Sequence, residues 1–172
     1  MSLKSSPQRY GRMPVVIHWL SALAVVIMLA TGLTMDSLGD ADPGGILVVH
    51  VLVGATLALL TILRIVWWLA IDRQPEAPAG LSPVQVWSAR IVHLGLYLTL
   101  VVTIASGIAT VALTGAAPAI FGGGQLPDFE AVPPFFAHAT VSRVLLILAV
   151  GHIAAALWHQ FIRRDRLLAR MS

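Results

Sequence analysis

Cysteine is absent from this chain of 172 residues. Disulfides, iron–sulfur clusters and haem attached through a Cys-x-x-Cys-His motif are therefore excluded. Charge is scarce, since Asp, Glu, Lys and Arg make up 11% of the residues, against about 25% in ordinary soluble domains. Hydrophobic residues make up 58%, and the mean hydropathy is +0.86. The composition therefore predicts a membrane protein rather than a soluble one.

The sequence also lacks the residue sets of several enzyme classes. It has no Gly-rich phosphate loop, no Ser/His/Asp set and no pair of carboxylates within an apolar segment, so hydrolysis and nucleotide chemistry are not indicated. The pI is near 10.2, yet no Lys and Arg cluster alternates with aromatic residues, so a nucleic-acid partner is not expected. The basic residues lie at the ends of apolar segments, where they set membrane topology.

Four apolar stretches are each long enough to cross the roughly 30 Å hydrocarbon layer, which takes about 20 helical residues. They cover about residues 15–35, 46–71, 87–113 and 136–162. The sequence predicts an all-α integral membrane protein, a single domain over residues 1–172 with a four-helix transmembrane bundle. Ser82-Pro83 predicts the cap and first position of a helical lead-in to the third span. The Gly- and Pro-rich connection from Thr114 to Pro134 predicts a cap over one membrane face.

The distribution of Lys and Arg predicts the orientation of the chain. Nine of these residues lie in the N-terminal arm, in the connection between the second and third spans, and in the tail: Lys4, Arg9, Arg12, Arg73, Arg90, Arg163, Arg164, Arg166 and Arg170. The other two connections carry only acids: Asp36, Asp40, Asp42, Asp128 and Glu130. By the positive-inside rule, both termini are expected in the cytoplasm.

All six histidines lie within or at the ends of the expected spans: His18, His50, His93, His138, His152 and His159. Ionisable side chains in a membrane helix are costly and usually functional. His138 and His152 are 14 residues apart, so they project from nearly the same helix face with a separation of about 21 Å. This arrangement fits two stacked haems, one near each membrane face. A zinc site would instead need three or four ligands at one point.

Each haem then needs a second axial ligand at the same depth. The second span starts on the periplasmic side, so His50 is expected level with His138. The first span starts on the cytoplasmic side, so His18 is expected nearer the level of His152. Depth therefore predicts the pairs His50–His138 and His18–His152, and His93 of the third span is the alternative to His18.

The interval of 14 residues recurs on the other helices. Gly32 follows His18 by this interval, and Gly107 follows His93. Each glycine is expected to face the bundle axis at the depth of the periplasmic haem, where a missing side chain would let the flat macrocycle approach the backbone. The alternative is the small-residue packing that is common between membrane helices.

Two arginines lie within the spans. Arg64 follows His50 by 14 residues, near the expected cytoplasmic haem, and its natural partner is a haem propionate. The alternative for Arg64 is snorkelling to the membrane surface. Arg143 is expected to serve the periplasmic haem in the same way. His93 and His159, if both haems are ligated as above, are candidates to bind a quinone carbonyl or to pass protons to the reduced quinone.

These residues together resemble the bacterial cytochrome b561 family. The resemblance covers nearly the whole chain and rests on Ile17-His18-Trp19-Leu20, on His50, on His93 with Leu94 and Tyr97, on His138, on the segment 151–159, and on the segment 167–171. It implies a four-helix cytochrome of the bacterial inner membrane with two haems b. It also implies bis-histidine ligation by His18, His50, His138 and His152, with His93 and His159 near a quinone site.

By this resemblance we expect transmembrane electron transfer from the periplasmic side to ubiquinone. The best-defined family activity is superoxide oxidase, yet the periplasmic connections carry acids and no Lys or Arg to attract a small anion. Superoxide oxidase is therefore an alternative. A second alternative is the cytochrome b subunit of a larger dehydrogenase or hydrogenase, with a basic protein donor on the acidic face. A metal or proton transporter is disfavoured, because the spans lack carboxylates.

Overall fold

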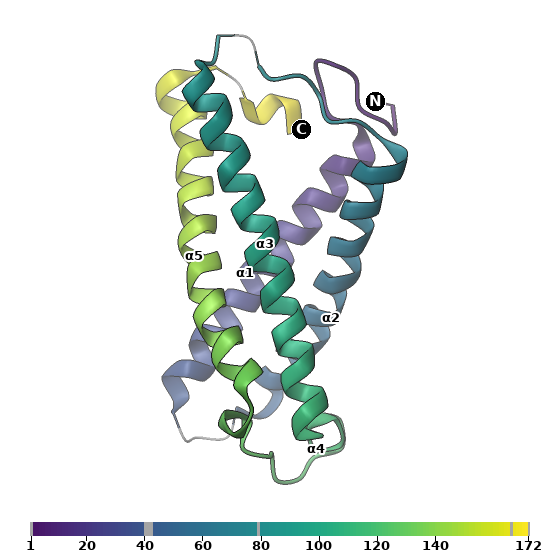
Figure 1. Cartoon of the computed structure of the whole chain (residues 1–172), viewed down its shortest axis with the longest axis vertical. Helices are drawn as coiled ribbons and strands as arrows, with labels where there is room; N and C mark the ends of the chain where they lie inside the picture. The colour runs from purple at the N-terminus through teal and green to yellow at the C-terminus, as the bar shows by residue number, and fades with distance from the viewer. Residues whose placement is uncertain (1, 40–42, 79, 166, 172) are drawn as a thin grey trace.

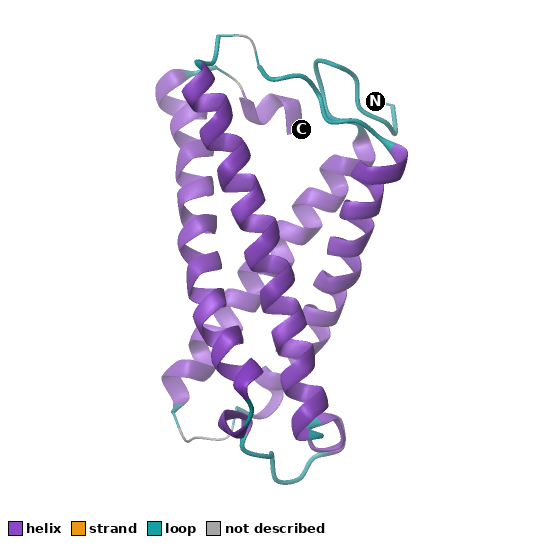
Figure 2. Cartoon of the chain, in the orientation of Figure 1, coloured by secondary structure: helices purple, strands orange, loops and turns teal. Residues whose placement is uncertain are grey.

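The computed structural model describes residues 2–39, 43–78, 80–165 and 167–171. Every regular element within these ranges is a helix (Figure 2). Four long helices run the length of the bundle (Figure 1): α1 (Arg12–Leu38), α2 (Gly44–Val66), α3 (Pro83–Thr114) and α5 (Pro133–Trp158). Each of them, with its terminal turn included, is long and apolar enough to cross a membrane. The prediction of a four-helix membrane protein is confirmed.

The helices extend beyond the expected spans, because hydropathy marks only their apolar part. α1, for example, begins three residues before and ends three residues after the expected range 15–35. α2 and α5 each end in a π-helical turn, η1 (Trp67–Ile71) and η3 (His159–Arg163). The predicted start of α3 is confirmed, since the Ser82 hydroxyl accepts a hydrogen bond from the Gln85 backbone and the Gln85 side chain accepts one from the Ser82 backbone.

The connection between α3 and α5 is more ordered than its composition indicates. It contains the short helix α4 (Ala117–Gly122) and the 3-10 turn η2 (Phe129–Ala131). Ala116 and Ile120 are buried, and α4 contacts α2. The connection therefore forms a packed cap at this end of the bundle. Asp40 and Asp42, in the other connection at this end, lie outside the described residues.

The four long helices form two pairs. α1 packs along α2, and α3 packs along α5, whereas the contacts between the pairs are few and lie mainly between α2 and α3 and between α2 and α4. No large side chain is fully buried in the part of the chain that the structure describes. The buried residues on the long helices include small or polar ones: Ser21, Ala24, Thr61, Thr103, Ser106 and Thr110. The two helix pairs are therefore joined mainly by a small number of contacts rather than by a continuous apolar core.

Both termini lie at one end of the bundle, which we call the terminal end (Figure 1). There the tail helix η4 (Leu167–Met171) ties three segments together. The Arg170 guanidinium donates hydrogen bonds of 2.8 Å to the backbone oxygens of Gln8 and Glu76. The Trp19 indole N–H donates a 3.0 Å hydrogen bond to the backbone oxygen of Met171. The arm, the connection from α2 to α3 and the tail thus form one hydrogen-bonded layer.

Candidate functional site

His50 and His138 lie next to each other although their helices, α2 and α5, belong to different pairs. Their ring centroids are 6.1 Å apart. Two imidazoles on opposite sides of one metal ion, each with a metal–nitrogen bond of about 2 Å, have centroids about 6 Å apart. The structure therefore brings together the pair that depth predicts, at the spacing that a shared iron would require.

The hydrogen bonds of these two rings fix which nitrogen remains free. His138 Nδ1 lies 2.8 Å from the backbone oxygen of Thr103, and a carbonyl only accepts, so Nδ1 carries the hydrogen. His50 Nδ1 lies 2.8 Å from Thr31 Oγ1, and the backbone oxygens of Ile27 and Met28, which can only accept, lie 2.8 and 3.1 Å from the same hydroxyl, so the Thr31 hydrogen is best directed to them. His50 Nδ1 is therefore also the donor. Both Nε2 atoms keep a lone pair, which is the arrangement of histidines that bind metals.

Gly32 and Gly107 lie at the depth of this histidine pair. A Cβ on Gly32 would lie 3.6 Å from His50 Cε1, which is ordinary van der Waals contact. A Cβ on Gly107 would lie 2.9 Å from His138 Cε1 and 3.0 Å from its Nδ1, which is closer than such atoms approach in proteins. Gly107 thus makes room for the His138 ring itself, a role that differs from the expected approach of a macrocycle to the backbone.

A second cluster lies toward the terminal end and contains His18, His93, His152 and Arg64. The rings of His93 and His152 have centroids 5.3 Å apart, because α3 and α5 pack directly along each other. His18 is an electrostatic neighbour of both histidines and of Arg64, and its buried Nδ1 has no hydrogen-bond partner among the described residues. The structure thus groups His18 with His152 as expected, but the ring in contact with His152 is that of His93.

Arg64 connects the two helix pairs at this level. Its guanidinium carbon lies 5.3 Å from the centroid of the Tyr97 ring on α3, and its charge acts on all three histidines of the cluster. Among the residues with described placement, no carboxylate forms an ion pair with it. A cation within a membrane helix is costly in free energy unless an anionic group lies beside it. A carboxylate on a bound group would be such an anion.

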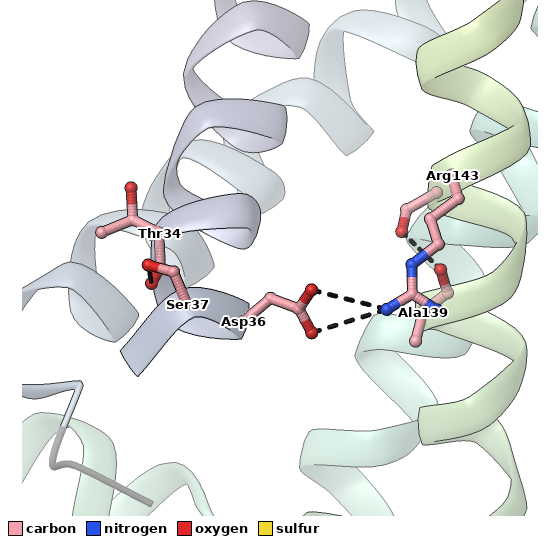
Figure 3. Close-up of polar contacts among 6 residues, drawn as sticks. Thr34, Asp36, Ser37, Ala139 and Arg143 are labelled. Atoms are coloured by element: carbon pink, nitrogen blue, oxygen red, sulfur yellow. Dashed lines mark hydrogen bonds and ion pairs between the residues drawn. The ribbon is translucent and has the colours of Figure 1, made fainter. Parts of the chain in front are cut away.

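Arg143, which is expected to serve the periplasmic haem, lies within reach of an acid on another helix. Its Nη2 lies 3.5 Å from both carboxylate oxygens of Asp36, so the ion pair joins α5 to α1 (Figure 3). Both side chains are largely exposed, at 63% and 65%. The pairing follows from the position of Asp36 in the last turn of α1, within reach of a long side chain on α5. The sequence alone gives no sign of this choice.

His159 lies at the end of α5 and has a carboxylate neighbour that sequence reasoning missed. Its Nδ1 is 2.5 Å from Asp165 Oδ2, and Arg163 Nε is 3.7 Å from the same oxygen. The only sign of it in the sequence is an acid six residues after a histidine at a helix end. This pattern is too common to identify a functional contact.

The histidines fit a haem better than an isolated metal ion. In the described ranges, no group of three His, Asp or Glu residues is placed to hold a metal ion. His50 and His138 instead meet as a close pair, and two histidines would suffice to hold a haem iron, because the macrocycle supplies its other ligands. Together with the free Nε2 atoms and the few contacts between the helix pairs, this geometry fits haem.

Comparisons with known proteins agree with this chemistry. Residues 9–172 match the family model of prokaryotic cytochrome b561. The chain is 32% identical to cytochrome b561 homolog 2 of Escherichia coli (strain K12), over 99% of this chain and 95% of that protein. It is 32% identical to cytochrome b562 of Cereibacter sphaeroides, over 94% of each chain. It is 24% identical to probable superoxide oxidase CybB of Yersinia pestis, over 95% of this chain and 96% of that protein.

Proposed function

Since the chain belongs to the prokaryotic cytochrome b561 family, we propose that it holds two haems b in tandem and carries electrons from the periplasmic side to ubiquinone. The family makes it a multi-pass membrane protein of electron transfer and implies haem b. When bound, the haems supply one-electron oxidation and reduction, and ligation by two histidines leaves no iron position open for oxygen. The number of haems, the acceptor and the ligands are the parts that we propose.

The observation that carries the proposal is the pair His50–His138. Its 6.1 Å centroid spacing and its two free Nε2 atoms support His50 and His138 as the two histidines that would hold one haem. Thr31 and Thr103 hold the rings by their Nδ1 hydrogens, and outer partners of this kind tune both ligand orientation and basicity. The chain thus provides ligands that are already oriented.

For the second haem we propose His152 with His18. His50 and His138 come from different helix pairs. Of the two remaining candidates, only His18 lies on the helix pair that does not contain His152, because α1 pairs with α2, whereas His93 lies on α3, the partner of α5. The ring of His93 contacts that of His152 within this same helix pair. Arg64 is proposed to bind a propionate, since a guanidinium forms charge-assisted hydrogen bonds with carboxylates.

The terminal end is proposed to face the cytoplasm. Of the nine Lys and Arg other than Arg64 and Arg143, eight lie in the described residues and all of these are at or near this end; Arg166 lies outside the described residues. The positive-inside rule places such an end in the cytoplasm. His93 and His159, on α3 and at the end of α5, are then the candidates for the ubiquinone site, because both lie in the half nearer the cytoplasm.

Superoxide oxidase is the second candidate function, because a relative with 24% identity carries that name. Against it stands the periplasmic half, in which Arg143 is paired with Asp36 and the described loop acids are Asp128 and Glu130. Such a surface repels a small anion rather than steering it inward. We therefore favour a donor other than superoxide, and a basic periplasmic protein has the matching charge.

The proposal is tested on the purified chain. A reduced-minus-oxidised spectrum should show b-type bands, haem extraction should give about two haems per chain, and the dithionite-reduced protein should be reoxidised by ubiquinone. One haem per chain, or no reoxidation by ubiquinone, contradicts the proposal. Mixing the oxidised protein with superoxide from xanthine oxidase then separates the two candidates: reduction no faster than that of an unrelated cytochrome b rules out superoxide as the donor.

A further inference from the structure

The chain reverses direction just after α5, and the reversal brings an acid back to His159. Arg164 has φ 57°, a left-handed conformation that costs a residue with a side chain some energy. After it, the Asp165 backbone N–H donates a 3.3 Å hydrogen bond to the His159 backbone oxygen. The reversal brings the carboxylate of Asp165 to the Nδ1 edge of the His159 ring, at the end of the membrane helix.

The contact fixes both the proton and the orientation of the ring. An ionised carboxylate only accepts hydrogen bonds, so the 2.5 Å contact places the hydrogen of His159 on Nδ1. The ring also packs edge-on against Trp158, with centroids 5.0 Å apart. Both side chains are mostly shielded, with 15% of His159 and 24% of Asp165 exposed. Nε2 is therefore the ring nitrogen left for another partner.

We propose that Asp165 is a positioning residue that holds His159 as a proton donor to the quinone. The inference rests on the proposed function, in which ubiquinone is reduced at this end of the bundle. Reduction of a quinone to a quinol takes up two electrons, which the cytochrome delivers, and two protons. The N–H bond at Nε2 of the charged imidazole breaks, an O–H bond forms on the quinone, and cytoplasmic water returns a proton to Nε2. A second O–H bond forms on the other quinone oxygen with a proton taken up from the cytoplasmic solvent, which completes the uptake of two electrons and two protons.

The roles of the two side chains follow from general acid chemistry. A donor must carry two ring hydrogens to release one and keep the other, and the carboxylate on Nδ1 stabilises this charged form without itself taking the proton. Arg163 Nε, 3.7 Å from the same Asp165 oxygen, is a second cationic partner of this carboxylate at the end of the helix. A purely structural Asp165 would cap the helix end and have no effect on proton delivery.

The substitution Asp165→Asn tests the proposal in the full haem-loaded chain. The dithionite-reduced protein is mixed with ubiquinone in a stopped-flow instrument. The limiting rate of reoxidation should fall about tenfold or more, because an oriented acid contributes at least that much, whereas half-saturation by ubiquinone should be unchanged. Reoxidation by ferricyanide, which takes an electron without a proton, should keep the wild-type rate. Asp165→Glu should restore most of the ubiquinone rate.

Two further measurements separate positioning from folding and from the proposed function. Nitrogen-15 spectra of histidine-labelled protein should show hydrogen on His159 Nδ1 in the wild type and lose this fixed state in Asp165→Asn. Glu76→Gln, which removes an acid at the same end of the bundle but outside this contact, should match the wild type in every assay. A wild-type ubiquinone rate in Asp165→Asn, or an equal loss with ferricyanide, overturns the inference. A wild type that ubiquinone does not oxidise overturns the proposed function, and the nitrogen spectra then still decide whether Asp165 positions His159.

Discussion

The rings of His50 and His138 lie 6.1 Å apart across the two helix pairs. If they ligate one haem, His138→Ala should lower the haem content from about two per chain to about one, and His50→Ala should do the same. The remaining haem should keep its b-type spectrum. Haem extraction and difference spectra make the measurement, and His159→Ala, which touches neither cluster of proposed ligands, is the control. Loss of both haems from either variant would show that the two sites are not independent.

Gly107→Ala and Gly32→Ala form a matched pair. The added Cβ at Gly107 would lie 2.9 Å from His138 Cε1 and displace the ring, whereas the one at Gly32 would lie 3.6 Å from His50 Cε1 and make ordinary contact. Disturbing the surroundings of a metal ligand typically costs 10- to 100-fold in affinity. Haem titration should show a loss of about this size for Gly107→Ala and little change for Gly32→Ala. Equal losses would mean that both glycines admit the macrocycle.

Replacement of His18 and of His93 decides the second ligand pair. We expect His18→Ala to lose the haem near the terminal end and His93→Ala to retain both haems, because His18 comes from the helix pair opposite His152. Haem content per chain is the measurement. In His93→Ala, slower reoxidation by ubiquinone with two haems present would support the proposed quinone site. The reverse outcome in haem content would exchange the roles of the two histidines.

Arg64→Gln should lower the reduction potential of one haem. The guanidinium lies in the cluster of His18, His93 and His152, and a nearby positive charge favours the reduced state. A decrease of roughly 60 mV corresponds to about 1.4 kcal/mol for one electron. Redox titration followed at the b-type band makes the measurement, with Arg90→Gln as the control for charge. An equal shift of both haems would argue against a local role.

The N-terminal arm should detach at acid pH. Burial raises the pKa of Asp72, but hydrogen bonds from the Ser5 backbone and hydroxyl, the Arg73 backbone and the Trp67 indole lower it by more. A folded-state pKa below the unfolded value of about 4 means that the stabilisation is complete above about pH 4 and is lost as the pH falls through the folded value. Trp67 fluorescence against pH should show this transition, and Asp72→Asn should lack it.

The spans, the cap at Ser82 and the common depth of His50 with His138 were predictable, because hydropathy and the helical rise determine them. The choice of His18 or His93 as the proposed second ligand of the haem at His152 depends on which helices pack together. The depth of a residue in the membrane does not determine this packing. The contact of Asp165 with His159 depends on the reversal at Arg164, and an arginine gives no sign of a left-handed conformation. The ion pair of Arg143 with Asp36 could not be predicted, because a long side chain reaches several partners and hydropathy does not give the position of Asp36 relative to α5.

The sparse contact between the pair α1–α2 and the pair α3–α5 bears on biogenesis. Each pair is a hairpin of two apolar helices, so the membrane insertion machinery can complete each one before the halves meet. We expect the cofactor, bound by histidines from both hairpins, to supply most of the adhesion between them. Cellular haem supply would then govern how much of this protein accumulates, because chains left without it would remain as loosely joined halves open to membrane proteases.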